Sequence, residues 1–217
     1  MLAIIAAMQK EADAVLCKST VKKSCTLCGK KIYYAELGGR DFNLIVCGIG
    51  KVNAAAGTQL AIDRLNADIL LNLGVAGGIS KNLKIGQLFS IVRAAQYDFD
   101  LSEVNNTSVG TLDEYTEPYL PCNRLASYPA ASLATGDRFN DSSSDLKLLT
   151  EFLQADIRDM EGAAIAQVAL AAGVPLYMVK SISDVVGSDC VQQYRDNLAR
   201  ALGTLSSAAP DIVREVK

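Results

Sequence analysis

Residues 68–78 read Asp-Ile-Leu-Leu-Asn-Leu-Gly-Val-Ala-Gly-Gly, an apolar run that ends with three glycines in five positions. A short apolar run without alternation is typical of a strand buried on both faces, as in parallel sheets covered by helices. Glycines let the backbone approach a ligand closely, and ligands of open α/β sheets bind at the carboxyl ends of strands. The stretch therefore predicts a central strand that ends in a ligand-binding turn, with a plain strand-to-loop bend as the alternative.

Outward from this run, the chain alternates strand and helix patterns. Apolar or β-rich segments predict strands over 2–7, 31–37, 42–47, 87–95 and 174–182. Helix-compatible segments cover 9–17, 52–65, 162–172 and 192–206. Since no linker interrupts the alternation, we expect residues 1–217 to form one α/β domain.

The composition excludes several kinds of chemistry. The 217 residues include no histidine, so Ser-His or Cys-His hydrolysis and His-ligated zinc are impossible within this chain. Acid–base work must fall to carboxylates, Lys, Tyr or Cys. Lys and Arg number 21 against 24 Asp and Glu, a net charge of −3, and no dense basic cluster occurs. Nucleic acid is therefore not an expected partner.

The lengths of the apolar segments and the cysteine content indicate the cellular compartment of the protein. No stretch approaches the roughly 20 apolar residues of a membrane helix, and the apolar start is too short for a secretory signal. We therefore expect a cytoplasmic protein without membrane association, whose six cysteines are reduced. Cys25 and Cys28 form a C-x-x-C pattern, but no second pair or His completes a zinc site, so we interpret them as ordinary turn thiols.

Residues 94–123 differ from the rest of the chain because they contain no Lys or Arg. The acidic residues of the segment are Asp98, Asp100, Glu103, Asp113, Glu114 and Glu117. A loop of this length in a compact domain is often a lid or an interface. A solvated surface excursion explains the pattern equally well.

The glycine turn Gly48-Ile49-Gly50-Lys51 invites a phosphate-loop interpretation, which fails. Ile45 stands where that loop needs its first glycine, and Val52 stands where Ser or Thr would bind magnesium. The dinucleotide fingerprint fails as well, because Asn53 occupies the third glycine position. A glycine turn leading into a helix N-terminus remains, and such a turn can approach a ligand.

Three carboxylates fall at ends of predicted elements. Glu11 follows the first strand, Glu161 precedes the 162–172 helix, and Asp184 follows the 174–182 strand. Two carboxylate oxygens can accept both hydroxyls of a ribose cis-diol, although an acid at a helix start is also the ordinary preference of the helix dipole. Asp184 is consistent with either an N-cap or a catalytic acid. Together with the two glycine turns, the three carboxylates indicate a site at this edge of the sheet.

Six segments in order give the chain a family resemblance. They are Ile-Ile-Ala-Ala-Met-Gln-Lys-Glu (4–11), Gly-Ile-Gly-Lys-Val-Asn-Ala-Ala (48–55), Gly-Val-Ala-Gly-Gly (74–78), Thr-Gly-Asp-Arg-Phe (135–139), Asp-Met-Glu-Gly-Ala-Ala (159–164) and Lys-Ser-Ile-Ser-Asp (180–184). With them the chain resembles the purine nucleoside phosphorylase superfamily and, within it, the 5′-methylthioadenosine/S-adenosylhomocysteine nucleosidases. The resemblance implies a three-layer fold with a central mixed, twisted sheet flanked by helices, and a homodimer that uses no cofactor. It also implies hydrolysis of the N-glycosidic bond of a 5′-thioadenosine, which releases adenine and a 5-thioribose.

The resemblance also assigns roles by position. Glu11 matches the residue that activates water, Asp184 the acid at purine N7, and Glu161 the carboxylate that binds the ribose 2′- and 3′-hydroxyls. The other substrate-binding positions that it implies are Phe139 against the base, Met160 beneath the ribose, Met8, Ile49 and Tyr194 around the 5′-alkylthio group, and Val75, Gly77 and Ser183.

Physical chemistry agrees with these roles. Cleavage of a ribosyl–purine bond builds positive charge on the sugar, as in glycoside hydrolysis. The leaving purine must gain a proton, so we expect the pKa of Asp184 to be raised. Glu11 must stay ionised to accept the proton of the attacking water.

Two positions depart from the family pattern. Val75 stands where Ser or Thr is common, and Lys180 stands where bacterial nucleosidases usually have Arg. Because Val cannot donate a hydrogen bond to an anion, Val75 favours water over phosphate as the nucleophile. The alternatives are a phosphate-dependent purine nucleoside phosphorylase, a hydrolase of another 5′-modified nucleoside, and a catalytically silent nucleoside-binding domain. The sequence does not determine the 5′ substituent.

Overall fold

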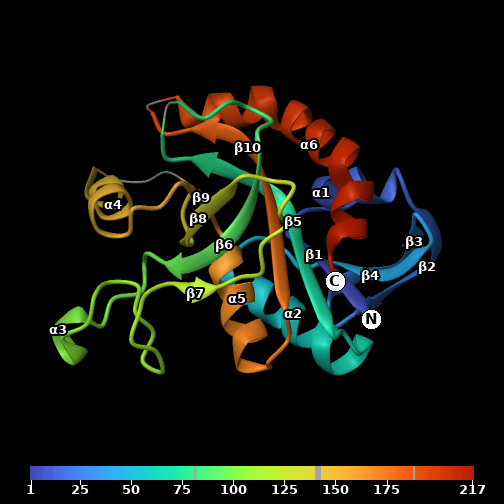
Figure 1. The fold of residues 1–217 in the computed structure, drawn as a ribbon, viewed down its shortest axis with the longest axis horizontal. Helices are drawn as coiled ribbons and strands as arrows, with labels where there is room; N and C mark the ends of the chain where they lie inside the picture. Colours follow the sequence, from blue (N-terminus) through green and yellow to red (C-terminus); the bar gives the residue numbers. More distant parts are fainter. Residues whose placement is uncertain (81, 140–142, 188) are drawn as a thin grey trace.

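A mixed β-sheet runs through the computed structural model, which describes residues 1–80, 82–139, 143–187 and 189–217 (Figure 1). Its strands are β1 (Leu2–Ala6), β2 (Thr20–Leu27), β3 (Lys30–Leu37), β4 (Arg40–Val46), β5 (Ile69–Gly78), β6 (Leu88–Gln96), β7 (Leu120–Pro121), β8 (Ala130–Thr135), β9 (Ile157–Asp159) and β10 (Leu176–Val185). The helices are α1 (Gln9–Leu16), α2 (Lys51–Leu65), α3 (Ser102–Asn105), α4 (Ser143–Lys147), the π-helical turn η1 (Leu148–Phe152), α5 (Gly162–Ala171) and α6 (Cys190–Glu215).

The sheet has a closed part and an open part, and β5 belongs to the closed part. β5 pairs in parallel with β1 and β10 and antiparallel with β9. From β10 the pairing continues through β6 and β8 to β9, so these strands return to β5 and close a ring (β5, β10, β6, β8, β9). On the other side of β5, an open arm consists of β1, β4, β3 and β2. The stretch predicted to be the central strand therefore lies where the two parts meet.

Side-chain alternation along the inner strands produces two cores. In β1, Ala3 and Ile5 pack in one core, together with apolar residues of α2 and α5. Leu2 and Ile4 pack in the other core, with residues of α1 and α6. Because successive side chains of a strand point to opposite faces, both faces of β1 are covered and its sequence is continuously apolar. Helices on both sides of a central sheet confirm the three-layer α/β architecture (Figure 1).

Several elements differ in extent from the sequence-based expectation. The strand expected to end at Ile182 continues through Asp184, with a bulge in its pairing with β5 between Ile182 and Asp184. The C-terminal helix, expected over 192–206, is α6 and extends to Glu215 through Pro210. Its buried apolar face, which includes Leu205 and Ile212, compensates for the backbone hydrogen bond that proline removes. No helix in the described ranges is long and apolar enough to cross a bilayer.

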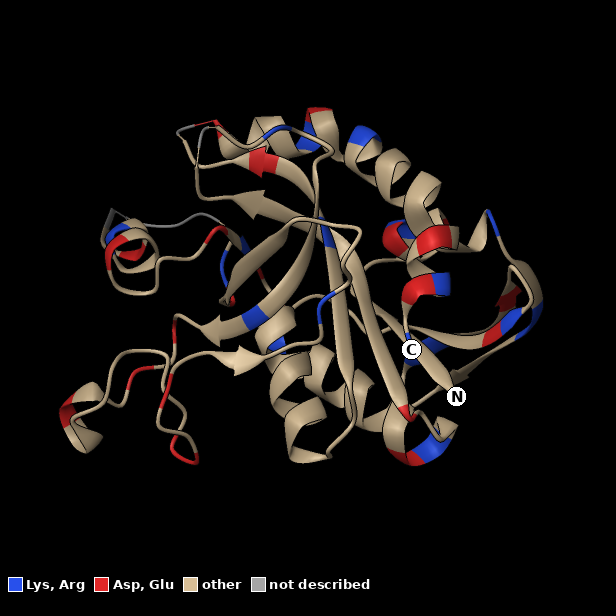
Figure 2. Cartoon of the chain, viewed as in Figure 1, with Lys and Arg blue, Asp and Glu red and all other residues tan. Residues whose placement is uncertain are grey.

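The acidic segment is not one uninterrupted loop. Residues 94–96 belong to β6, and the short elements α3 and β7 divide the remainder of the segment. Figure 2 shows that the charged residues of α3 and of the loops next to it are acidic. The first acid of the segment, Asp98, is tied to the body of the protein by an ion pair with Lys51 in the first turn of α2. The segment is therefore anchored at the start, next to the glycine turn 48–51.

Candidate active site

A cavity opens at the carboxyl ends of β1, β5 and β10. The structure brings all eleven predicted site residues to its wall: Met8, Glu11, Ile49, Val75, Gly77, Phe139, Met160, Glu161, Ser183, Asp184 and Tyr194. The wall also includes Ala7, Ala76, Arg138, Arg158 and Asp159. The structure thus shows that the eleven predicted residues surround one cavity. The roles that the family resemblance assigns to them stay predictions.

Glu11 is held rigidly where β1 leads into α1. As the third residue of α1, it accepts hydrogen bonds at Oε2 from the N–H groups of Ala7 and Met8, both at 3.0 Å. The N–H of Val75 donates to Oε1 at 2.9 Å. Burial raises the pKa of Glu11 above its ordinary value, although Lys180 and these N–H groups act in the opposite direction. A buried carboxylate with a raised pKa is suited to accept a proton.

Gly74 is required for this placement of Glu11. A Cβ atom at position 74 would lie 2.5 Å from Glu11 Oε1, far inside van der Waals contact. The glycine turn therefore leaves room for the carboxylate side chain. The prediction that residues 74–78 approach a ligand stays a prediction, since the group that approaches Gly74 is the carboxylate of Glu11.

Glu161 points into the cavity because a neighbour caps α5 in its place. Asp159 accepts the N–H groups of Glu161 and Gly162 and the hydroxyl of Thr135, the last at 2.6 Å. Glu161 itself accepts the N–H of Gly50 at 2.8 Å, which the positive φ of Gly50 (+96°) turns toward it. The helix-start explanation thus applies to Asp159, and the Glu161 carboxylate is directed to the site.

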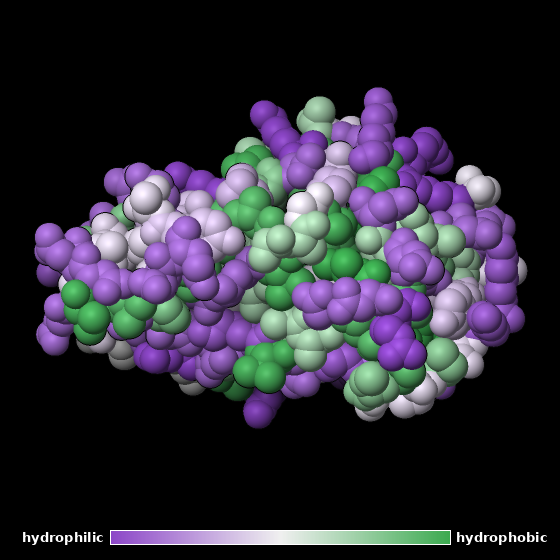
Figure 3. Space-filling view, turned by 90° about the horizontal axis from the view of Figure 1, so that it is seen from below, coloured by the Kyte–Doolittle hydropathy of each residue, from purple (hydrophilic) through white to green (hydrophobic). Residues whose placement is uncertain are grey.

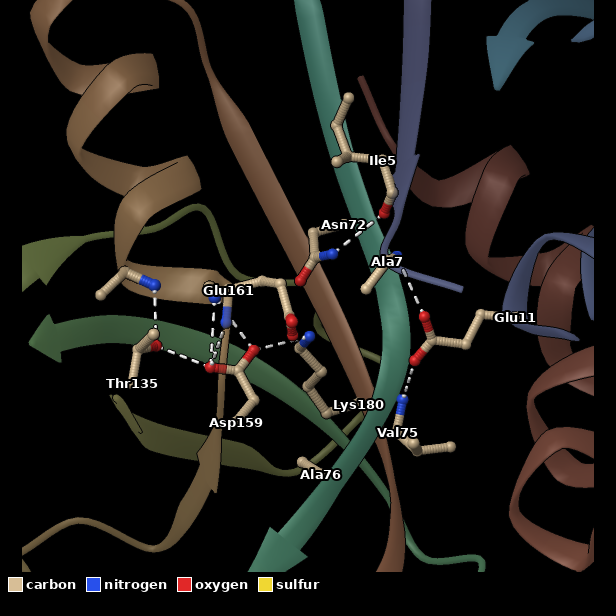
Figure 4. A network of polar contacts seen from close by, with 12 residues as sticks. Ile5, Ala7, Glu11, Asn72, Val75, Ala76, Thr135, Asp159, Glu161 and Lys180 are labelled. Atoms are coloured by element: carbon tan, nitrogen blue, oxygen red, sulfur yellow. Dashed lines mark hydrogen bonds and ion pairs between the residues drawn. The ribbon is translucent and has the colours of Figure 1, made fainter. Parts of the chain in front are cut away.

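Lys180 lies beneath these acids and is almost completely buried. Its Nζ is 2.8 Å from Asp159 Oδ2, and both side chains are 2% exposed (Figure 4). Burial lowers the pKa of Lys180, but the charges of Asp159, Glu161 and Glu11 outweigh that effect and raise it overall. Burial and the charge of Asp159 raise the pKa of Glu161 to about 7, while Lys180 lowers it. Lys180 is therefore a buried cation whose charge lowers the pKa values of Glu161 and Glu11.

Asp184 lies on the other side of the cavity, next to the bulge of β10. The Ser183 hydroxyl donates to Asp184 Oδ1 at 2.8 Å, and Arg158 Nη2 lies 3.5 Å from Asp184 Oδ2. A bulge re-aims the side chains around it, and here Ser183 is the extra residue that precedes Asp184. A Cβ at Gly77 would approach Asp184 Oδ2 to 2.9 Å, so the glycine leaves room for this carboxylate. The raised pKa expected for Asp184 stays a prediction.

Aromatic and sulfur side chains form the outer wall of the cavity. The rings of Phe139 and Tyr194 are 5.1 Å apart in an edge-to-face arrangement, and the Tyr194 hydroxyl donates to Met8 Sδ at 3.5 Å. Ile49, also on the wall, is 52% exposed. This side is apolar and partly open, which suits a flat base and a thioether better than a strongly charged group.

Arg158 is a residue that the sequence analysis missed. Its guanidinium donates to the backbone carbonyl of Phe139 as well as lying beside Asp184, so it links the aromatic wall to the acid. It is 6% exposed. No signal in the sequence could have found it, because its place in the wall depends on how β9 lies against β8 and β5.

Comparison with protein families supports the assignment that fold and site suggest. A family model described as "Phosphorylase superfamily" matches residues 1–215, so the chain belongs to the phosphorylase superfamily. A 5′-methylthioadenosine/S-adenosylhomocysteine nucleosidase of Listeria innocua is 30% identical over 215 residues, 89% of this chain and 90% of the relative. The nucleosidase of Colwellia psychrerythraea is 28% identical over 99% of this chain and 96% of its own. Within the superfamily, the chain is thus a member of the methylthioadenosine/S-adenosylhomocysteine nucleosidase family, and it is an N-glycosyl hydrolase.

Comparison with solved structures agrees with this family membership. The Colwellia psychrerythraea nucleosidase in complex with adenine superposes with a TM-score of 0.90 at 28% identity, covering 100% of this chain and 95% of the other. A futalosine hydrolase of Helicobacter pylori superposes equally well, with a TM-score of 0.90 over 99% of this chain and 97% of its own, but at 24% identity that likeness concerns the fold alone.

Proposed function

We propose that the protein hydrolyses the N-glycosidic bond of 5′-methylthioadenosine and S-adenosylhomocysteine, releasing adenine and a 5-thioribose. The observation that carries the proposal is the placement of Glu11, Glu161 and Asp184 around one cavity with an aromatic, sulfur-lined side. The relatives named for these two substrates, and the neighbour that contains adenine, support the same substrate class.

In the proposed reaction, water adds across the bond between ribose C1′ and adenine N9. Asp184 gives a proton to N7 as the C1′–N9 bond breaks, and the sugar passes through an oxocarbenium-like transition state. Glu11 takes a proton from the water as its oxygen bonds to C1′. Glu161 accepts the 2′- and 3′-hydroxyls, while Phe139 stacks on the base and Met160 packs beneath the ribose.

Water rather than phosphate is the proposed nucleophile. Val75 contributes an N–H to the turn, and Glu11 accepts it, while the Val75 side chain offers no hydrogen-bond donor. The two arginines on the wall are also engaged, Arg138 with Asp145 at 2.9 Å and Arg158 with Asp184 and the Phe139 carbonyl. An incoming phosphate would have to compete with these carboxylates for the guanidinium groups.

Adenine release from methylthioadenosine, S-adenosylhomocysteine, adenosine and inosine, each with and without phosphate, tests the proposal. We expect phosphate-independent release from the two thioethers. Release that requires phosphate would make the protein a phosphorylase. No release from any of the four would leave a hydrolase of another nucleoside or a silent binding domain, and binding measurements with the same compounds would separate these.

We also infer that the enzyme is a cytoplasmic homodimer. Val52, in the first turn of α2, is 82% exposed, and Leu170 of α5 is 39% exposed. Figure 3 shows apolar side chains gathered in the middle of the face that α2 and α5 help to form. A second copy on this face would cover the apolar surface close to Ile49 at the rim of the site.

A further inference from the structure

A second cavity adjoins the active-site cavity. The residues that line it are Met8, Gln9, Lys10, Tyr194, Arg195 and Leu198. Met8 and Tyr194 also line the active-site cavity, and the hydrogen bond between them makes them a common wall. The family resemblance assigns this pair to the 5′ substituent, so a substituent longer than methylthio would extend toward the second cavity.

The second cavity presents two cations and no acidic side chain. Within the described ranges, neither Lys10 nor Arg195 forms an ion pair. Lys10 lies in the first turn of α1, where the helix dipole favours an acid and disfavours a cation. The packing and the ion pairs of the fold therefore give these charges no stabilising partner.

The other polar side chains of the lining already have partners: the Tyr194 hydroxyl donates to Met8 Sδ, and Gln9 is held by two hydrogen bonds. Its Nε2 donates to Asp13 Oδ1 at 2.8 Å, and its Oε1 accepts the hydroxyl of Tyr33 at 3.0 Å. The nearest exposed acid of α1, Asp13, thus binds an amide rather than Lys10. The groups left to meet a ligand in this cavity are Lys10 and Arg195, and no carboxylate of the lining would bind an ammonium group.

We propose that the second cavity is a subsite for a carboxylate at the far end of the 5′ substituent, held by Lys10 and Arg195. The inference rests on the proposed nucleosidase function and sharpens it: the preferred substrates are adenosine thioethers whose tail carries a negative charge. A neutral methylthio group leaves the subsite empty. A tail that ends in an ammonium group alone is repelled.

Four matched substrates test this inference. They are methylthioadenosine, S-adenosylhomocysteine, its analogue without the α-amino group, and its analogue without the carboxylate. In the wild-type enzyme we expect kcat/KM for adenine release from the deaminated analogue to exceed that from the decarboxylated analogue by about tenfold, since an exposed ion pair contributes up to about fivefold and two cations act together. The ratio should fall as salt is added, because salt screens exposed charges.

Variants assign the effect to the two cations. Lys10→Gln and Arg195→Gln should each reduce the ratio by about threefold to fivefold, and the double variant should bring it close to one. Lys18→Gln, which removes an exposed cation just beyond the opposite end of the same helix, is the matched control and should keep the wild-type ratio. Expressing each rate relative to methylthioadenosine in the same variant removes general losses of activity.

The subsite proposal would be wrong if the ratio of kcat/KM for the two analogues were near one in the wild-type enzyme, or if it were unchanged in the double variant. Turnover of methylthioadenosine would still support the nucleosidase function in that case. Failure of the folded wild-type enzyme to release adenine from any of the four would instead overturn the proposed function. The two failures are therefore distinguishable in one set of assays.

Discussion

At the scale of single residues, Glu11 and Asp184 are expected to carry the proton transfers. Glu11→Gln keeps the shape of the side chain and removes its basicity, so turnover of methylthioadenosine should fall by about 10²–10⁴-fold. Asp184→Asn should have an effect of similar size. Adenine release under saturating substrate measures both, with thermal unfolding as the control for folding. Most of the activity surviving in either variant would contradict its assignment.

Glu161 should give the enzyme a pH dependence near neutrality. Its pKa is raised to about 7, and only the ionised carboxylate can accept both ribose hydroxyls. We therefore expect kcat/KM to rise with pH through about 7, as Glu161 loses its proton. In Glu161→Gln the rise of kcat/KM with pH should disappear, along with most of the activity.

Lys180 determines the pH at which kcat/KM rises. Because its charge lowers the pKa of Glu161, Lys180→Met should raise that pKa and shift the rise of kcat/KM to higher pH. Lys180→Arg restores the cation and should return the profile toward neutrality. A loss of activity in Lys180→Met without any shift of the profile would mean that Lys180 has only a structural role.

At the scale of elements, two helical glycines allow a matched test of packing. A Cβ at Gly57 of α2 would lie 2.6 Å from Cys47 Cβ, whereas a Cβ at Gly203 of α6 meets nothing within 4 Å. Alanine favours a helix over glycine by about 1 kcal/mol. Gly203→Ala should therefore stabilise the protein by up to about 1 kcal/mol, while overpacking of about 1–3 kcal/mol should make Gly57→Ala neutral to destabilising.

Urea unfolding of the two variants measures this difference in the free energy of unfolding. Equal stabilisation by both substitutions would show that α2 does not pack on the sheet as closely as the structure has it.

Elements that carry a strong pattern could be predicted from the sequence. β5, β10 and the alanine-rich α5 have long apolar runs, because they are buried on both sides or against the sheet. β2 is polar along most of its length, β8 reads Ala-Ala-Ser-Leu-Ala-Thr without β-branched residues except at its end, and β9 has three residues. These strands exist because a neighbouring strand offers hydrogen bonds, and that tertiary information is absent from local sequence.

The candidate site was predictable to a similar degree. The family resemblance identified the residues that surround the cavity. Those that follow or end the strands β1, β5 and β10 lie close together because these strands end at the same edge of the sheet. Arg158 and the capping role of Asp159 were not predictable, since both depend on how β9 lies against β8 and β5. The charge balance around Lys180 also required burial to be known.

At the scale of the whole molecule, the proposed homodimer makes a prediction about self-association. Val52→Asp places a charge on the exposed apolar face of α2, so we expect the dimer to dissociate at micromolar concentration because an unpaired buried charge is strongly unfavourable. Sedimentation velocity should give about twice the chain mass of 23.1 kDa for the wild type and a single chain mass for the variant. A wild-type monomer would contradict the proposal, and a Val52→Asp dimer would place the interface elsewhere.

The closed ring of strands also bears on aggregation. An edge strand of a sheet offers unpaired backbone N–H and C=O groups to other molecules. Closing a sheet on itself removes such edges. In the part of the chain that the structure describes, one end of the sheet returns to β5, and the open arm ends at β2, which is exposed nearly throughout. Lys22 and Lys23 lie in that strand, within the charged hairpin that Figure 2 shows at the opposite end from α3. The lysines oppose intermolecular strand addition at the outer strand of the arm, where β2 remains unpaired on one side.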